Sequence, residues 1–464
     1  MKEECGIIGV HRHELATDLV YLGLHSLQHR GQEACGISAS AGRSITTVKG
    51  SGLVDDVFQS TEDLEKLKPA FQSLGHVRYA TSGENILENT QPLMVRSHQG
   101  DFCVAHNGQI VNAPELRYEL ELKGSIFQGT TDSEVICHLI QRAKGSMLEK
   151  ISAACQQLVG AFSLAIMTKN TMYAVRDKNG LRPLCLGRMD ESWVISSESC
   201  ALNLIGSKLL RDVAPGEIIK LGKQGFESHF YVEAAERRKK LCAMEYVYFA
   251  RPDSRLDEHN VHQVRRQTGF VLGQRDEVEA DIVIGVPDSS LSAASGYAEA
   301  RGLPYEMGLV KNRYIGRTFI NPGQELRAAN VKIKLSAITD IVRGKRIILV
   351  DDSIVRGTTA KRIVELMREA GAREIHLRIV APPLVAPCFY GIDLKNKQQL
   401  LAANLNAKEL VKFFGCDSLE FLSLEELFSC CGDGVCTACF NEDYPTPLFS
   451  HEAAVNGACA GLDD

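Results

Sequence analysis

The chain has 464 residues, of which 44% are hydrophobic and 24% are charged, and its 52 Lys and Arg against 58 Asp and Glu give a formal net charge of −6. This length predicts two or three domains, of which we expect two, and the composition is typical of a globular protein. The protein is mildly acidic and has no long basic run that would attract nucleic acid. No apolar run reaches the roughly 18 residues that span a bilayer. We therefore expect neither a nucleic-acid nor a membrane partner.

The N-terminus and the cysteines indicate where the protein works. Residues 1–5 read Met-Lys-Glu-Glu-Cys, so two acids stand where a secretory signal would have basic residues and then an apolar run. We expect a cytoplasmic protein. Because the cytoplasm is reducing, closely spaced members of its 15 cysteines are expected to be catalytic or metal-bound rather than disulfide-bonded.

The first half of the chain alternates short apolar strands, such as 162–167 and 193–196, with helical segments such as 133–142. This pattern favours an α+β layered domain. The charged run 233–240, EAAERRKK, lacks an apolar face and is typical of a linker or an exposed helix. We therefore expect one domain over residues 5–235 and a second over residues 236–464.

In the second half, apolar strands are followed by helices. We expect strands at 281–286, 346–350 and 376–380. Between the last two, one helical face carries apolar residues, and Gly371 is placed to end the helix. The apolar residues of this face are Ala360, Ile363, Val364, Met367 and Ala370. A strand–helix–strand unit predicts a parallel sheet and an α/β domain.

Cys5 opens the first expected strand, in the segment CGIIG, where a cysteine can equally be a small apolar core residue. Four polar motifs accompany it: HRGQE at 29–33, HVRYAT at 76–81, HNGQI at 106–110 and TTDSE at 130–134. Together they resemble the N-terminal-nucleophile glutamine amidotransferases. The resemblance covers the whole first domain and implies an αββα sandwich with Cys5 as nucleophile.

The chemistry of such a nucleophile explains the residues around it. If Cys5 is the mature N-terminus, its α-amine, with a pKa of about 8, can take the thiol proton and return it to ammonia. This requires removal of residues 1–4 as a propeptide. The resemblance assigns the oxyanion to the Asn107 side chain and the Gly108 N–H, the glutamine α-carboxylate to Arg78 and its α-ammonium to Asp132. Taken singly, such an Arg or Asp is more often a solvated surface group.

The expected strand 346–350 leads into DDSIVRGTT at 351–359 and then into a helix. Such a loop can bind a phosphate through its backbone N–H groups, its hydroxyls and the N-terminus of the following helix. The same residues would also fit a simpler structure, in which an acidic strand end is followed by an ordinary helix cap. The run resembles the signature of type I phosphoribosyltransferases. In that family Asp351 and Asp352 would engage the ribose hydroxyls and Mg²⁺, and the loop residues would bind the 5-phosphate; these are Ser353, Arg356, Gly357, Thr358 and Thr359.

Two further segments extend this resemblance. PDSS at 287–290 is similar to the loop that contacts pyrophosphate and, through Ser289, the metal, since Mg²⁺ prefers oxygen ligands. KNRYIGRT at 311–318, with Lys311 and Arg317, looks like the mobile loop that closes over the diphosphate. Closure would exclude water from the site. Because ammonia is protonated in bulk water, we also expect an internal channel between the two domains.

The late cysteines include the pair Cys436 and Cys439, a spacing shared by zinc, redox and iron–sulfur sites. The family resemblance adds Cys242 and Cys388 and implies that the four thiolates hold a structural [4Fe-4S] cluster. Cys430 and Cys431 lie close in sequence, but we expect them to be ordinary exposed or half-buried thiols.

Across nearly its full length the chain thus resembles the glutamine phosphoribosylpyrophosphate amidotransferases of the subclass with a propeptide and an iron–sulfur cluster. The resemblance implies conversion of glutamine, phosphoribosyl pyrophosphate and water to phosphoribosylamine, pyrophosphate and glutamate, the committed step of purine synthesis. It also implies feedback inhibition by purine nucleotides and a homo-oligomer, which we expect to be a homotetramer. The alternatives are an aminosugar synthase, which would carry sugar isomerase modules, and a regulatory binding protein that keeps the fold and senses nucleotide or iron status without turnover.

Overall fold

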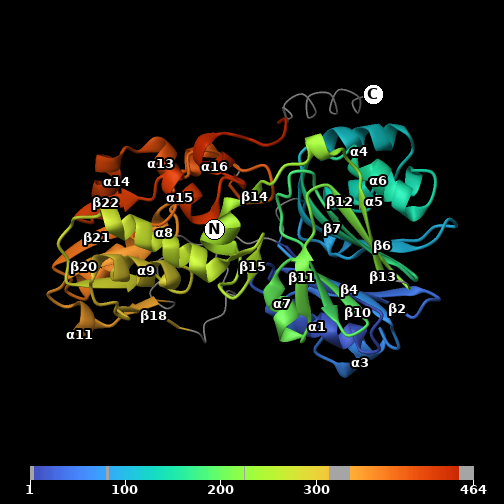
Figure 1. The fold of residues 1–464 in the computed structure, drawn as a ribbon, viewed down its shortest axis with the longest axis horizontal. Helices are drawn as coiled ribbons and strands as arrows, with labels where there is room; N and C mark the ends of the chain where they lie inside the picture. The colour runs from blue at the N-terminus through green and yellow to red at the C-terminus, as the bar shows by residue number, and fades with distance from the viewer. Residues whose placement is uncertain (1–4, 80–82, 224, 313–334, 395, 449–464) are drawn as a thin grey trace, which may run out of the picture.

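The structure is a computed structural model that describes residues 5–79, 83–223, 225–312, 335–394 and 396–448. The chain forms two lobes side by side, the N-terminal half in one and the C-terminal half in the other (Figure 1). Residues 1–4, expected as a propeptide, lie outside the described residues, as does Arg317.

The first lobe is built on two antiparallel sheets. The first sheet has seven strands, and their order is β11 (Lys208–Asp212), β9 (Cys185–Met189), β10 (Ser192–Ser196), β1 (Gly6–His11), β4 (Gln72–Arg78), β2 (Ala34–Ser40) and β3 (Ile45–Ser51). The second has six, in the order β13 (Gly225–Phe230), β12 (Glu217–Gly222), β8 (Met172–Arg176), β7 (Gly160–Thr168), β6 (Phe102–Ile110) and β5 (Leu93–Val95).

Helices cover the outer face of each sheet. The first sheet packs on α1 (Ala16–Ser26), α7 (Ser199–Leu204) and the short helices α2 (Val54–Val57) and α3 (Thr61–Glu65). The second packs on α4 (Ala113–Leu122), α5 (Ser133–Arg142) and α6 (Met147–Cys155). A third apolar cluster fills the space between the sheets. Since both faces of β1, β2 and β4 are covered, every residue in these strands is buried. The expected αββα sandwich is confirmed.

The charged run after β13 is exposed and contains only a 3-10 turn at Ala234–Glu236. It leads to β14 (Leu241–Cys242), a π-helical turn at Glu245–Phe249 and a hairpin of β15 (Arg255–Leu256) and β16 (His259–Asn260). The lack of an apolar face explains the linker, because such a segment has nothing to bury.

The second lobe contains a parallel sheet in the order β17 (Ile282–Gly285), β20 (Arg346–Asp351), β21 (Glu374–Ile379) and β22 (Ser418–Phe421). One face packs on α8 (Val261–Arg275) and α9 (Leu291–Arg301), and the other on α12 (Thr358–Glu369) and α14 (Ala407–Phe414). The expected α/β domain is confirmed. Gly371, with φ +90°, follows the end of α12, as the sequence pattern predicts.

Smaller elements complete this lobe. A hairpin of β18 (Leu309–Lys311) and β19 (Leu335–Ala337) precedes α11 (Thr339–Val342), and α13 (Leu401–Asn404) follows a 3-10 turn at Lys397–Gln399. The last elements are α15 (Leu424–Cys431), β23 (Val435–Cys436) and α16 (Ala438–Asn441), and β23 pairs in parallel with β14.

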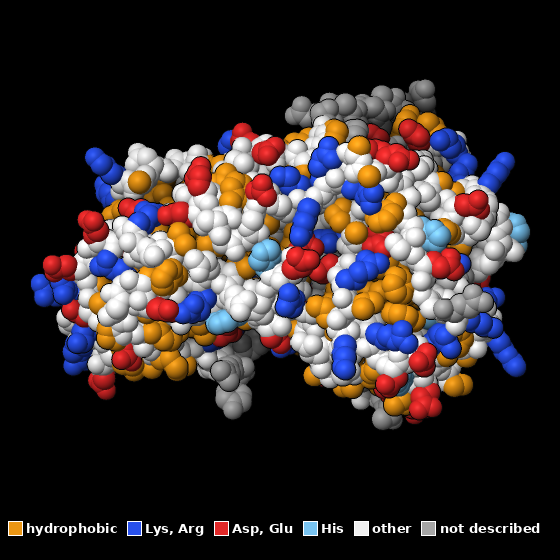
Figure 2. All heavy atoms as spheres, viewed as in Figure 1, with side chains coloured by type: hydrophobic (Ala, Val, Ile, Leu, Met, Phe, Trp, Pro, Cys, Tyr) orange, Lys and Arg blue, Asp and Glu red, His pale blue; other side chains and the backbone are white. Residues whose placement is uncertain are grey.

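The surface charges and the lengths of the helices can be compared with what the composition predicts. On the face in Figure 2, Lys and Arg side chains are interspersed with Asp and Glu rather than gathered into one patch. Among the described helices, none is long and apolar enough to cross a membrane.

Candidate active sites

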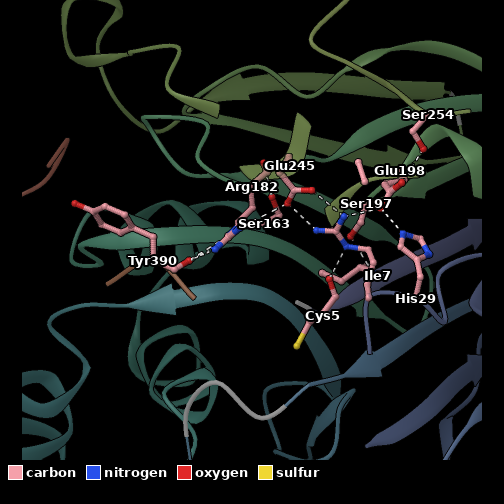
Figure 3. A network of polar contacts seen from close by, with 12 residues as sticks. Cys5, Ile7, His29, Ser163, Arg182, Ser197, Glu198, Glu245, Ser254 and Tyr390 are labelled. Carbon is pink, nitrogen blue, oxygen red and sulfur yellow. Dashed lines mark hydrogen bonds and ion pairs between the residues drawn. The ribbon is translucent and has the colours of Figure 1, made fainter. Parts of the chain in front are cut away.

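Cys5 lies directly before β1, at the end of the first sheet where β4 also ends. Strand pairing places Gly6 opposite Val77, so Cys5 stands next to Arg78, the last residue of β4. Its Sγ donates to the Tyr79 carbonyl oxygen at 3.5 Å, and its own carbonyl oxygen accepts a hydrogen bond from Arg30 Nε at 3.0 Å. Figure 3 shows the sulfur pointing away from the polar network behind it. The thiol is only partly buried, as a nucleophile must be to meet a substrate.

The expected oxyanion donors lie on β6, a strand of the second sheet that contacts β1 across the sandwich, where Ile7 and Ala105 belong to the same apolar cluster. Asn107 is 1% exposed, and its Nδ2 has no hydrogen-bond partner among the described residues. A buried, unpaired amide donor is costly, typically about 1–3 kcal/mol. Such a group fits a donor that is satisfied only when an oxygen ligand arrives. Gly108 has φ +142°, and a Cβ there would lie 2.1 Å from the Ala161 carbonyl oxygen.

Buried polar contacts hold this part of β6 in place. His76 Nε2 donates to the His106 carbonyl oxygen at 3.1 Å, which ties the two sheets together. Burial lowers the pKa of His76 to about 3, so the ring is neutral at physiological pH. His106 Nδ1 lies 2.8 Å from the Ser133 hydroxyl, and the His106 N–H donates to Gln91 Oε1 at 2.6 Å. The peptide before Asn107 is therefore fixed from both sides.

The two residues expected to bind the glutamine backbone are both buried, but each already has protein partners. Arg78 donates to Asn85 Oδ1 and to the Glu84 carbonyl oxygen, each at 3.1 Å. Asp132, at the start of α5, accepts a hydrogen bond from the Ile110 N–H at 2.8 Å. Asp132 thus also anchors β6, a structural role that the sequence analysis did not anticipate.

A cavity of about 720 Å³ lies at the carboxyl ends of β17 and β20. It brings together every described residue that was expected to bind phosphoribosyl pyrophosphate or Mg²⁺: Ser289, Lys311, Asp351, Asp352, Ser353, Arg356, Gly357, Thr358 and Thr359. This is the edge at which α/β sheets bind ligands. Thr358 and Thr359 are exposed in the first turn of the 12-residue helix α12, where free N–H groups favour phosphate.

The two acids of the loop are buried and accept hydrogen bonds from three serine hydroxyls. Asp352 accepts from the Ser289 and Ser353 hydroxyls, each at 2.5 Å, and Asp351 accepts from the Ser290 hydroxyl at 3.2 Å. Burial first, and the neighbouring Asp352 second, raise the pKa of Asp351 to about 7. Two buried carboxylates with hydroxyl neighbours are a hard, all-oxygen donor set that fits Mg²⁺.

Two basic residues of the loops around the cavity are paired with protein groups. Lys311 Nζ lies 2.6 Å from Asp288 Oδ2, and Arg356 donates twice to Gln399 Oε1. Gly357 begins α12 with φ +71°, and a Cβ there would lie 2.5 Å from Leu401 Cδ2. Only glycine combines a favourable positive φ with the absence of a Cβ, and this turn requires both.

The cavity also includes residues that the sequence analysis missed. His29 comes from the first lobe, and Arg265 on α8 is buried while its guanidinium donates to the carbonyl oxygens of Tyr246 and Ala250. His29 belongs to the HRGQE motif, which indicates the amidotransferase domain but does not predict a place in this cavity. Arg265 carries no local signal, because only the packing of α8 brings it to the cavity.

A network of buried charges joins the two lobes behind Cys5 (Figure 3). Arg30 lies 2.6 Å from Glu198 and 2.7 Å from Glu245, and Arg182 lies 3.5 Å from Glu245; all four side chains are 0% exposed. Glu198 also accepts from His29 Nε2 at 2.8 Å and the Ser254 hydroxyl at 2.7 Å. Although burial opposes ionisation, His29 and Arg30 hold the pKa of Glu198 well below its usual value.

The four cysteines expected to hold a cluster lie near one another in the second lobe. Cys242 on β14 is the strand partner of Cys436 on β23, and the Val385 and Ala386 N–H groups donate to the Cys439 carbonyl oxygen at 2.9 and 3.1 Å. Cys388 is close enough to influence both Cys436 and Cys439 electrostatically. All four are buried in one apolar cluster.

The chemistry of this donor set fits an iron–sulfur cluster, although the side chains are not arranged as a finished site. Within the described parts of the chain, no group of three or more His, Cys, Asp or Glu is positioned to hold a metal ion. Burial raises the pKa of Cys436 to about 12. Cys430 is half-buried, as expected, whereas Cys431 is buried and donates to the Leu427 carbonyl oxygen, because it lies on the inner face of α15.

Comparisons with known proteins agree with this arrangement. The glutamine amidotransferase domain family matches residues 76–203, and the phosphoribosyl transferase domain family matches residues 259–384. Amidophosphoribosyltransferase of Bacillus subtilis is 48% identical over 97% of this chain and 95% of its own length. That of Methanothermobacter thermautotrophicus is 46% identical over 97% and 96%.

Solved structures give the same result. The glutamine phosphoribosylpyrophosphate amidotransferase of B. subtilis, complexed with ADP and GMP, matches with a TM-score of 0.91 and 47% identity over 96% of this chain and 98% of that one. A structure described as the allosteric regulatory enzyme of purine biosynthesis matches with a TM-score of 0.92, also at 47% identity, over 96% of this chain and 97% of that one.

Proposed function

This chain belongs to the amidophosphoribosyltransferase family, and from that premise we propose that Cys5 releases ammonia from glutamine and that the cavity around Asp351 receives it on phosphoribosyl pyrophosphate. The family's activity transfers the amide nitrogen of glutamine to phosphoribosyl pyrophosphate, the first step of purine biosynthesis. The observation that carries the proposal is that one chain holds a partly buried thiol at the start of β1, a buried amide on β6 whose Nδ2 has no partner among the described residues, and a cavity that collects the phosphoribosyl residues.

In the proposed glutaminase half-reaction, the thiolate of Cys5 attacks the side-chain carbonyl carbon of glutamine. The α-amine of a mature Cys5 takes the thiol proton and returns it to the departing ammonia. The Asn107 Nδ2 and Gly108 N–H donors stabilise the oxyanion, while Arg78 and Asp132 hold the α-carboxylate and α-ammonium of the substrate. Water then releases glutamate from the thioester. Intact-mass analysis tests the processing, because a chain that still begins at Met1 has no free α-amine at Cys5.

In the proposed synthase half-reaction, ammonia attacks C1 of the ribose and pyrophosphate leaves. The 5-phosphate binds at Ser353, Thr358 and Thr359, where hydroxyls and N–H groups of α12 are available. Lys311 exchanges Asp288 for the diphosphate. Asp351 and Asp352, with Ser289, would hold Mg²⁺, which supplies positive charge to the diphosphate oxygens. Arg317 remains a predicted contact of the diphosphate, outside the described residues.

The most informative experiment compares the nitrogen donors glutamine and ammonia in Cys5→Ala. We expect loss of the glutamine-dependent reaction with the ammonia-dependent reaction retained, because the substitution removes only the nucleophile. Loss of both reactions in a folded variant would contradict the assignment of two separate sites.

We also propose that Cys242, Cys388, Cys436 and Cys439 hold a [4Fe-4S] cluster that ties the C-terminal segment to β14. Their burial in one apolar cluster and the pairing of Cys242 with Cys436 support this. Anaerobically purified protein should contain about four iron atoms per chain and absorb broadly near 400 nm. Iron-free protein with full activity would refute the assignment.

Inhibition by purine nucleotides and a homotetramer are further parts of the proposal. The solved B. subtilis relative is complexed with ADP and GMP, which supports a nucleotide effector here. Titration of activity with purine nucleotides and light scattering of the purified protein test the two points. The expected cytoplasmic location stays a prediction.

A further inference from the structure

Residues 388–394, which we name the bridging segment, touch three separate regions of the molecule without forming regular secondary structure. Cys388 belongs to the cysteine group, while Asp393 and Leu394 line the phosphoribosyl cavity. Between them, the Tyr390 carbonyl oxygen accepts two hydrogen bonds from Arg182 of the first lobe, at 3.1 and 2.5 Å. This segment is therefore a direct physical link between the two lobes.

Gly391 of the bridging segment lies close to Gly108 of the glutaminase site. It is buried with φ +109°, and a Cβ at this position would lie 3.3 Å from the Gly108 carbonyl carbon and 3.1 Å from Arg182 Nη2. On its other side, Gly108 is confined by the Ala161 carbonyl oxygen, 2.1 Å from where its own Cβ would be. Gly108 is thus confined on one side by β7 of its own domain and, at its carbonyl group, by the main chain of the other domain.

Arg182 fixes the bridging segment to the strand beside Asn107. Its carbonyl oxygen accepts from the Ser163 hydroxyl at 3.1 Å, and Ser163 is the strand partner of Asn107. Its guanidinium reaches Tyr390 on one side and lies 3.5 Å from Glu245 on the other. In Figure 3 Ser163, Arg182 and Tyr390 form a continuous series that ends at the second lobe.

We propose that Gly391 is a positioning residue of the oxyanion hole, contributed by the phosphoribosyltransferase domain: its main chain, held by Arg182 through the Tyr390 carbonyl, lies against the Gly108 carbonyl group and so fixes the backbone of Gly108, whose N–H is the proposed donor. The inference rests on the proposed role of Asn107 and Gly108. The glutaminase site is then complete only when the second domain is docked.

Gly391→Ala tests this in the full-length enzyme. A methyl group here would lie 3.3 Å from the Gly108 carbonyl carbon, closer than an ordinary contact, so Gly108 has to shift slightly. We therefore expect kcat for glutamine hydrolysis to fall about tenfold or more, while KM for glutamine stays within about twofold. Synthesis with ammonia should be unchanged. Glutamate γ-semialdehyde is a sharper probe, because the Cys5 thiol adds to its aldehyde carbon and the resulting oxygen occupies the oxyanion position. Its inhibition constant should rise by the factor by which kcat falls.

Gly100→Ala is the matched control. Gly100 has φ +119°, and nothing lies within 4 Å of its Cβ position, so the substitution adds a similar backbone cost without a contact. Its glutaminase kinetics should match those of the parent enzyme. Arg182→Lys gives a second variant should Gly391→Ala not fold: it keeps the charge opposite Glu245, weakens the hold on Tyr390 and should lower kcat severalfold in the same pattern.

The outcomes separate this inference from the proposed function. Full kcat and full aldehyde affinity in Gly391→Ala, together with loss of both in Asn107→Ala, would overturn the inference and leave the proposed function standing. Equal loss of glutamine- and ammonia-dependent activity would show that Gly391 is needed for folding in general, and would also overturn the inference. Glutamine hydrolysis by Cys5→Ala would instead refute the proposed function itself.

Discussion

Replacing Glu245 by Gln is expected to destabilise the junction between the lobes strongly. The side chains of Arg30, Arg182, Glu198 and Glu245 are all 0% exposed, and their two positive charges face two negative charges. Glutamine leaves a net positive charge in this buried group and turns one oxygen acceptor that now faces Arg30 into a donor. Removing one partner of a buried pair typically costs about 3–5 kcal/mol.

The single tryptophan, Trp193, is 5% exposed on β10 and reports unfolding of the first lobe through its fluorescence. If the free energy of unfolding falls by about 3 kcal/mol per molar urea, a loss of about 3 kcal/mol of stability lowers the urea concentration at the midpoint of unfolding by about 1 M. Glu227→Gln is the control, because Glu227 pairs with Lys220 at 3.0 Å on the surface, where such pairs contribute about 0–1 kcal/mol. If Glu245→Gln shifts the midpoint no more than Glu227→Gln, the reasoning from buried charge is wrong.

Three further substitutions follow from single positions. Asn107→Ala should lower kcat with glutamine about 100-fold or more and spare the ammonia reaction, measured as phosphoribosylamine formation from each donor; equal effects on both would contradict an oxyanion role. Gly357→Ala should raise KM for phosphoribosyl pyrophosphate, because its Cβ would lie 2.5 Å from Leu401 Cδ2, while glutaminase kinetics measured without that substrate stay normal. Burial raises the pKa of Asp212 to about 6, above its unfolded value, so folding favours the neutral acid and stability is lost as pH rises from about 4 to about 6. Asp212→Asn should therefore be more stable than the parent near pH 7.5, with the difference vanishing near pH 4 in urea titrations at each pH.

The sequence predicts those parts of the sites that are contiguous along the chain. Asp351 to Thr359 stand between a strand and a helix that are both visible as apolar patterns, so the loop and its place at the sheet edge follow from local rules. The partners of Arg30 do not follow in this way. Glu198 and Glu245 lie far along the chain, and only the docking of two domains shows that they share one guanidinium.

The features that the sequence predicts wrongly or does not predict also depend on contacts between distant parts of the chain. Cys431 was expected to be exposed or half-buried, yet packing of α15 buries it. Gly391 stands in an irregular segment without periodicity, so its contact with Gly108 is invisible before the lobes are assembled. Helix and strand positions depend on near neighbours, whereas these contacts depend on the final arrangement of the whole chain.

The parallel pairing of β14 with β23 has a consequence for how the protein is made. β14 is among the first parts of the second domain to leave the ribosome, but its partner strand is among the last. The first lobe, whose sheets need no strand beyond β13, can therefore complete its core while the second is still being synthesised. β14 has to wait for Val435 and Cys436, so a truncated chain that ends before them should retain a folded first lobe and leave β14 without its neighbour.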